Sequence, residues 1–124
     1  MYEIEIFGSI VQEKTKDNQV TMTEIRNQLK DADGAEVLLL INSGGGSTIN
    51  GSAILDEMDR YQGTINAHIM GICASMATQI ASKCQSVSMN SNALSSQSLL
   101  TLLHKYYIEN MDTVAWHLHK HERY

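Results

Sequence analysis

EVLLLINSGGGSTINGSAILDEM, residues 36–58, is the stretch that decides the fold. Residues 37–41 are continuously apolar, which predicts a strand buried on both faces of a largely parallel sheet. The three glycines at 44–46 interrupt the pattern and predict a loop. Residues 48–63 then carry apolar side chains at helical spacing. A buried strand, a glycine-rich loop and a helix in this order predict one unit of an α/β domain.

The rest of the chain repeats this alternation of strands and helices. The first helix, residues 23–34, is expected to be capped by Thr23 and stopped by Gly34. The other expected elements are strands at 2–7, 64–71 and 86–89, a polar loop at 12–19, a short helix at 75–82 and one long helix from about Ser96 to the end. The order β-α-β-α-β-α-β-α implies parallel strands joined by crossover helices, and so a single α/β domain over residues 1–124.

Composition argues against several partners. The chain has 124 residues, a formal net charge of −5 and no cluster of Lys and Arg, so neither nucleic acid nor an anionic membrane is expected as a partner. The longest apolar run, residues 37–41, is far too short to cross a bilayer. The two cysteines, Cys73 and Cys84, form neither a disulfide framework nor a metal-binding pattern, which favours a reducing cytoplasm.

Two loops follow predicted strands, where α/β proteins place their ligands. In the first, residues 42–47, glycine N–H groups can form a nest for a phosphate or an oxyanion, although a plain tight turn fits the same sequence. In the second, MGICASMAT at 70–78, Ser75 opens a helix and Met76 can offer its backbone N–H to an oxyanion. A serine that only caps the helix is the simpler interpretation of this second loop.

Together the two loops resemble the ClpP family, the proteolytic subunit of the Clp protease, and most of all the shorter ClpP-like proteins of phages and prophages. LLLINSGGGSTINGSAILDEM, at 38–58, resembles the family's I-N-S-P-G-G-S loop and the helix after it. GICASMA, at 71–77, resembles the family segment that carries the nucleophilic serine. YEIEIFGSI, at 2–10, and SVSMNSNAL, at 86–94, resemble the family's first strand and a later strand.

The resemblance implies a fold, a site and a set of partners. The fold would be ClpP/crotonase-like, with repeated β-α-β units and a long C-terminal helix. Ser75 would be the catalytic nucleophile, and the N–H groups of Met76 and of Gly45 or Gly46 would form the oxyanion hole. A peptide or an unfolded protein would lie beside the glycine loop as an extended substrate. The family also implies a ring-like homo-oligomer, with an ATPase unfoldase or other Clp subunits as partners.

The family's catalytic histidine and aspartate have no clear counterparts at the corresponding positions of this sequence. Ser96, Gln97 and Ser98 occupy the register where the family has its catalytic histidine. His104, at the end of SLLTLLH, can replace it if a short insertion is accepted, although helical spacing favours a position on the last helix. The family's aspartate follows that helix, and no residue up to Tyr124 matches it, so the domain is short at its C-terminus relative to the family.

These departures leave a second interpretation open. Gly44 and Asn90 stand where the family has prolines, which makes the glycine loop less pre-organised. A serine without a base keeps its proton near neutral pH, so an inactive structural or regulatory subunit is the alternative.

A crotonase-like thioester enzyme would need a longer chain and an adenine-binding region. His117 and His121 have the spacing of a zinc site, but a solvated helix face is the simpler interpretation, so neither metal nor cofactor is expected.

Overall fold

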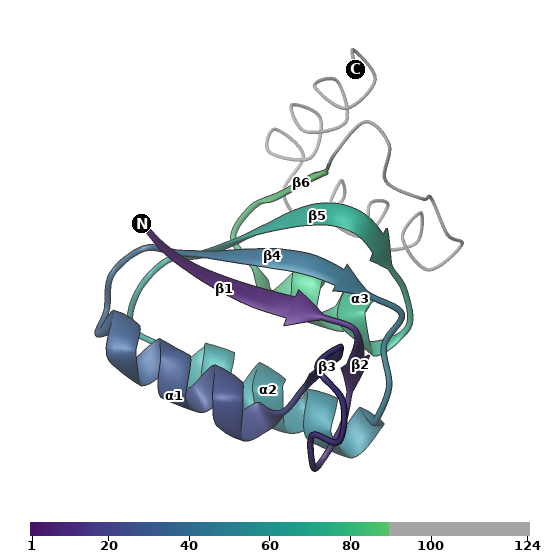
Figure 1. Cartoon of the computed structure of the whole chain (residues 1–124). Coiled ribbons are helices and arrows are strands. Elements are labelled where there is room, and N and C mark those ends of the chain that lie inside the picture. The colour runs from purple at the N-terminus through teal and green to yellow at the C-terminus, as the bar shows by residue number, and fades with distance from the viewer. Residues whose placement is uncertain (90–124) are drawn as a thin grey trace.

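The computed structural model describes residues 1–89, which are built around a four-stranded parallel sheet in the order β1-β4-β5-β6 (Figure 1). The elements in chain order are β1 (Tyr2–Phe7), β2 (Ser9–Ile10), β3 (Gln19–Val20), α1 (Met22–Ala32), β4 (Val37–Ser43), α2 (Thr48–Arg60), β5 (Ile65–Cys73), α3 (Met76–Lys83) and β6 (Val87–Met89). The predicted α/β fold is confirmed. The long helix expected from Ser96 onward lies outside the described residues.

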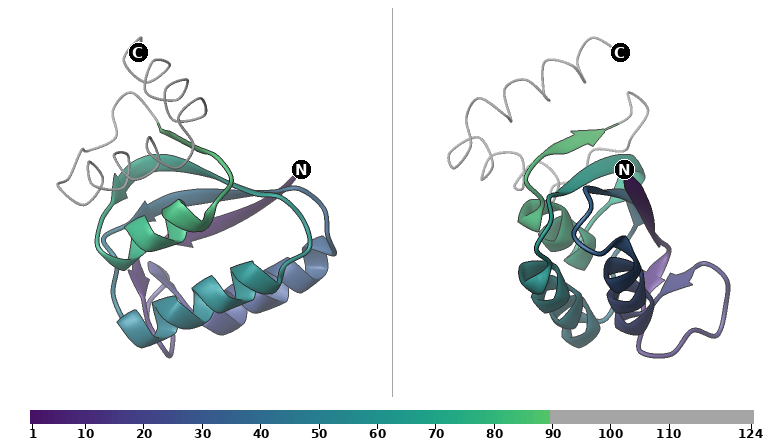
Figure 2. Two further views of the ribbon diagram at one scale, coloured as in Figure 1. Left: turned by 180° about the vertical axis from the view of Figure 1, so that it is seen from behind. Right: turned by 90° about the vertical axis from the view of Figure 1, so that its left-hand side faces the viewer.

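The described helices α1, α2 and α3 lie on one face of the sheet, with α1 beside α2 (Figures 1 and 2). The prediction that the central strand is buried on both faces is confirmed for only one of its faces. Val37, Leu39 and Ile41 of β4 face the helices and are at most 1% exposed, whereas Leu38 and Leu40 between them are only half-buried. None of the helices in the described range is long and apolar enough to cross a membrane.

The core lies between the sheet and these helices, and it is made of aliphatic side chains. Alternate residues of each long strand point into it, because successive side chains of a strand face opposite sides of the sheet. The helices contribute residues spaced three or four apart. The largest fully buried side chains are Ile4, Ile6, Ile10, Ile25, Leu39, Ile41, Ile54, Ile69 and Ile80.

The polar loop predicted at 12–19 is confirmed over residues 12–18, and the short strands β2 and β3 on either side of it pair as a small parallel sheet that the sequence does not predict. Gly8 turns the chain between β1 and β2 at φ +76°, and a Cβ on it would lie 1.8 Å from the carbonyl oxygen of Asn18. Ile10 of β2 also pairs with Gly46 in the loop after β4. The small sheet therefore supports one side of the glycine loop.

The N-terminus of α1 differs from the sequence prediction. Thr21, not Thr23, is the N-cap, and it forms a capping box with Glu24. The Thr21 hydroxyl accepts the N–H of Glu24 at 3.2 Å, and the Glu24 carboxylate accepts the N–H of Thr21 at 3.2 Å. Thr21 is buried, whereas Thr23 is exposed. The helix therefore begins at the threonine that has a glutamate three residues later, which is the spacing of a capping box.

This cap predicts a clear difference between two similar substitutions. Thr21→Ala removes the acceptor for the Glu24 N–H, and we expect it to lower the free energy of unfolding by about 1 kcal/mol. Thr23→Ala removes the same atoms from an exposed helical position, and a change of less than about 0.5 kcal/mol is expected. Urea unfolding of both variants measures the difference. Equal losses would contradict the capping assignment.

Candidate functional site

The glycine loop after β4 lies directly against the turn that carries Ser75. Because β4 and β5 are adjacent parallel strands, the segments that follow them emerge at the same edge of the sheet. A Cβ built on Gly45 would lie 2.8 Å from the Cβ of Ser75 and 3.1 Å from the backbone nitrogen of Met76. The two loops that the sequence singles out are therefore in contact, and only glycine fits at position 45.

Ser75 has an unusual backbone conformation. Its φ is +54° and its ψ is −129°; among residues 1–89 only Asp33 shares a positive φ with it outside the glycines. Such a conformation costs on the order of 1–3 kcal/mol and persists where surrounding structure imposes it. Ser75 occupies the N-cap position of α3, yet its side chain makes no capping hydrogen bond, and the residue is exposed. A purely capping role, the simpler interpretation of the sequence, therefore does not fit this hydroxyl.

The first turn of α3 includes the backbone N–H of Met76, the residue that follows Ser75. Ala77 donates to the carbonyl of Ala74 at 3.1 Å, and Thr78 donates to the carbonyl of Ser75 at 3.0 Å. No acceptor for the N–H of Met76 lies within the described part of the chain. Unpaired N–H groups at a helix N-terminus favour a negative charge, and this one adjoins the serine.

The glycine loop supplies a second N–H donor, and the hydrogen bonds of the loop distinguish Gly46 from Gly45 in this role. The N–H of Gly45 already donates to the hydroxyl of Ser43 at 3.1 Å. The two hydrogen bonds of the bridge between Ile10 and the loop use the Gly45 carbonyl and the Ser47 N–H, each at 2.9 Å. In a parallel bridge of this kind, the N–H of Gly46 points away from β2. Gly46 is exposed, and its N–H has no acceptor among residues 1–89.

Ser43 holds the loop and the serine turn in place, although the sequence analysis did not single it out. It is 1% exposed, and its hydroxyl donates to the carbonyl of Gly8 at 2.6 Å while accepting from Gly45. Its carbonyl accepts the N–H of Ala74, next to Ser75, at 3.2 Å. The signal in the sequence is a serine that ends an apolar strand immediately before a glycine loop.

The expected general base cannot be placed. His104, like the register positions 96–98, lies outside the described residues. His68 is the one histidine among residues 1–89; it is half-buried on β5 rather than in the core. Its Nδ1 lies 2.7 Å from the hydroxyl of Ser88, its neighbour across the β5–β6 pair.

The two thiols are poor candidates for the nucleophile. Cys73, two residues before Ser75, and Cys84 are both buried, and neither forms a disulfide. Burial raises the pKa of each thiol to about 12, so both stay protonated near neutral pH. The described range also contains no group of three or more His, Cys, Asp or Glu side chains that could hold a metal ion.

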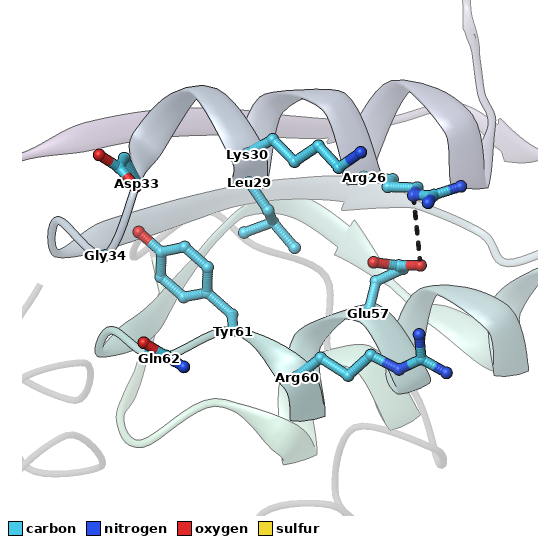
Figure 3. A pocket seen from close by; sticks show the side chains of 9 residues that line it. All are labelled: Arg26, Leu29, Lys30, Asp33, Gly34, Glu57, Arg60, Tyr61 and Gln62. Carbon is cyan, nitrogen blue, oxygen red and sulfur yellow. Dashed lines mark ion pairs between the residues drawn. The ribbon is translucent and has the colours of Figure 1, made fainter.

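A separate cavity of about 330 Å³ lies between α1 and α2 (Figure 3). It is lined by the C-terminal halves of both helices, which lead into the N-terminal ends of β4 and β5. Arg26 and Glu57 face each other across it at 3.8 Å (Figure 3). Arg60 pairs with Asp56 at 2.9 Å. The Arg60–Asp56 pair is exposed and the Arg26–Glu57 pair is partly buried, and ion pairs at a protein surface contribute little to stability. No serine, cysteine or histidine is among the residues that line this cavity.

The sequence model of the Clp protease family matches residues 3–102. Among solved structures, a variant of ClpP1 from Listeria monocytogenes is similar, with a TM-score of 0.58 and 19% sequence identity. The similarity covers 73% of this chain and 56% of that one, so the chain spans little more than half the length of that protein. At this identity the structural match establishes the fold alone. No curated protein matches the chain in sequence.

The contact between the two loops predicts that alanine is destabilising at Gly45 and tolerated at the neighbouring Gly44. Gly45→Ala places a methyl group against Ser75 and forces a side chain to φ +101°, so we expect a loss of about 1–3 kcal/mol in the free energy of unfolding. Gly44→Ala is the matched control, because a Cβ there meets nothing within 4 Å and its φ is not left-handed. Chemical denaturation should therefore show a much larger loss for Gly45→Ala. Equal stability of the two variants would mean that the loops do not touch.

Proposed function

Because the chain belongs to the Clp protease family, we propose that it is a ClpP-like serine endopeptidase subunit that hydrolyses peptide bonds through an acyl-enzyme on Ser75. The observation that carries this proposal is the packing of the glycine loop against the turn of Ser75, at a distance that only glycine allows. This packing brings the exposed Ser75, whose neighbour Met76 has an N–H without an acceptor in the described part of the chain, against Gly45. The next residue, Gly46, also has an N–H without an acceptor among residues 1–89.

The proposed reaction begins with attack by the Ser75 hydroxyl oxygen on the carbonyl carbon of the peptide bond. The hydroxyl proton passes to a general base, and the carbonyl oxygen becomes an oxyanion. The tetrahedral intermediate then collapses, the base returns the proton to the leaving amine, and an ester on Ser75 remains. Water attacks this ester with help from the same base, which releases the acid and restores the serine.

The oxyanion would be stabilised by the N–H groups of Met76 and Gly46. Met76 is held by the first turn of α3, and Gly46 by the bridge of its loop to Ile10, so both donors belong to fixed backbone. Gly45, the other glycine expected in this role, already donates its N–H to Ser43. Removal of one such donor typically costs about 10²–10³ in rate.

The general base in this proposal is His104. It is the histidine that the resemblance to the family points to, through the residues Leu-Leu-His that end SLLTLLH. The substrate would be an extended peptide or an unfolded protein whose main chain pairs with the free side of the glycine loop. The opposite side of that loop is occupied by Ile10.

The assembly would be a ring-like homo-oligomer in the cytoplasm, the host cytoplasm if the protein is viral. An ATPase unfoldase or other Clp subunits are the partners that the family suggests. Neither nucleic acid nor a membrane surface fits the net charge of −5.

A catalytically inactive structural or regulatory subunit is the second candidate. The observation that favours it is the sequence at the family's histidine register, where Ser96, Gln97 and Ser98 stand. Gly44, in place of a proline, also makes the glycine loop costlier to order.

Covalent labelling with a fluorophosphonate distinguishes the two candidates. The expected result is a single adduct on Ser75, located by mass spectrometry of the digested protein, and no adduct in Ser75→Ala. His104→Ala should slow the labelling by about 10²-fold or more, because a base that takes the hydroxyl proton contributes at least that much. Arg26→Ala, in the cavity between α1 and α2, is the matched control and should be labelled at the wild-type rate. A folded, assembled protein that takes up no label would instead support the inactive subunit.

A further inference from the structure

We propose that Asn42 is a positioning residue for Ser75, acting through an irregularity in β5; the catalytic part of this inference rests on the proposed function. The pairing of β4 with β5 runs in step as far as Ile41 and Ile69. The next pair is Ser43 with Cys73, so β4 advances by two residues while β5 advances by four. The strand β5 therefore carries a bulge of two extra residues within Met70–Ile72.

The side chain of Asn42 lies on this bulge. Its Oδ1 accepts the N–H of Ile72 at 3.0 Å, which gives this N–H a partner where the regular ladder is interrupted. A Cβ built on Gly71 would lie 2.7 Å from the same oxygen, so the absence of a side chain at Gly71 makes room for the amide. The backbone of Asn42 is itself fixed, because its carbonyl accepts the N–H of Gly8 at 2.9 Å.

The bulge determines how far along the sheet the serine turn begins. If the two extra residues continued β5 as a regular strand, Cys73 would lie about 6–7 Å farther along the strand direction, at roughly 3.3 Å per residue. Because the bulge accommodates them, Cys73 stands opposite Ser43, and Ser75 lies beside Gly45. An insertion of two residues also keeps Cys73 on the buried face, because side chains alternate with a period of two.

Asn42 therefore acts on the nucleophile without touching it. It accepts one hydrogen bond from the N–H of Ile72, three residues before Ser75. That bond helps to hold the bulge in the conformation that brings Ser75 to the glycine loop. Displacement of a reacting group by about 1 Å can cost about 10²-fold in rate. Loss of the side-chain Oδ1 of Asn42 should thus slow acylation of Ser75. The core lies on the other face of β4 and should stay intact.

Two substitutions at this position separate the hydrogen bond from the bulk of the side chain. Asn42→Leu keeps the size but removes the acceptor, and Asn42→Asp keeps an oxygen acceptor at the same place. The first measurement is deuterium exchange of the peptide covering 70–76, with the peptides of α1 and α2 as internal controls of folding. Exchange at Ile72 should speed up at least about tenfold in Asn42→Leu and stay close to wild type in Asn42→Asp.

The second measurement is the rate of fluorophosphonate labelling of Ser75 in the same proteins. We expect Asn42→Leu to be labelled about 10–100-fold more slowly than wild type, and Asn42→Asp to recover most of the rate. Wild-type labelling of Asn42→Leu, or equal slowing of both variants, overturns the inference. If the wild-type protein takes up no label, the proposed function fails, and the exchange at Ile72 still decides whether Asn42 holds the bulge.

Discussion

The close approach of Gly45 to Ser75 is the constraint on which the rest of the site depends. Any side chain at position 45 would have its Cβ 2.8 Å from the Cβ of the serine, so the two loops form one structural unit. Parallel pairing of β4 with β5 brings the loops to the same edge of the sheet. At this contact Ser75 has a positive φ, is exposed, and makes no hydrogen bond that caps α3.

Two consecutive residues of β4 hold this arrangement from opposite faces of the sheet. Ser43 faces the core, where its hydroxyl joins the end of β1 to the N–H of Gly45. Asn42 faces the other way, where its amide holds the bulge of β5. Because side chains alternate along a strand, adjacent residues can reach both the loop and the neighbouring strand. A buried hydroxyl with both of its hydrogen bonds made is costly to remove, about 1–3 kcal/mol for a buried group left unpaired.

The sequence predicts the order of elements and the two loops, because hydrophobic periodicity and glycines are local signals. It misplaces the cap of α1, since Thr21 and Thr23 are both possible caps and only the pairing with Glu24 distinguishes them. The bulge in β5 and the pairing of β2 with β3 depend on contacts between distant segments, which periodicity does not report. The assignment of His104 as the base stays a prediction, because it lies outside the described residues.

The most direct test is a crystal structure of the assembled protein after reaction with a fluorophosphonate. The bound phosphonyl oxygen imitates the oxyanion of the tetrahedral intermediate. We predict an adduct on Ser75 whose oxygen accepts hydrogen bonds from the N–H groups of Met76 and Gly46, at about 2.7–3.1 Å. An adduct oxygen that points into solvent, a Gly46 N–H turned toward another partner, or an adduct on a different residue would contradict this view of the site.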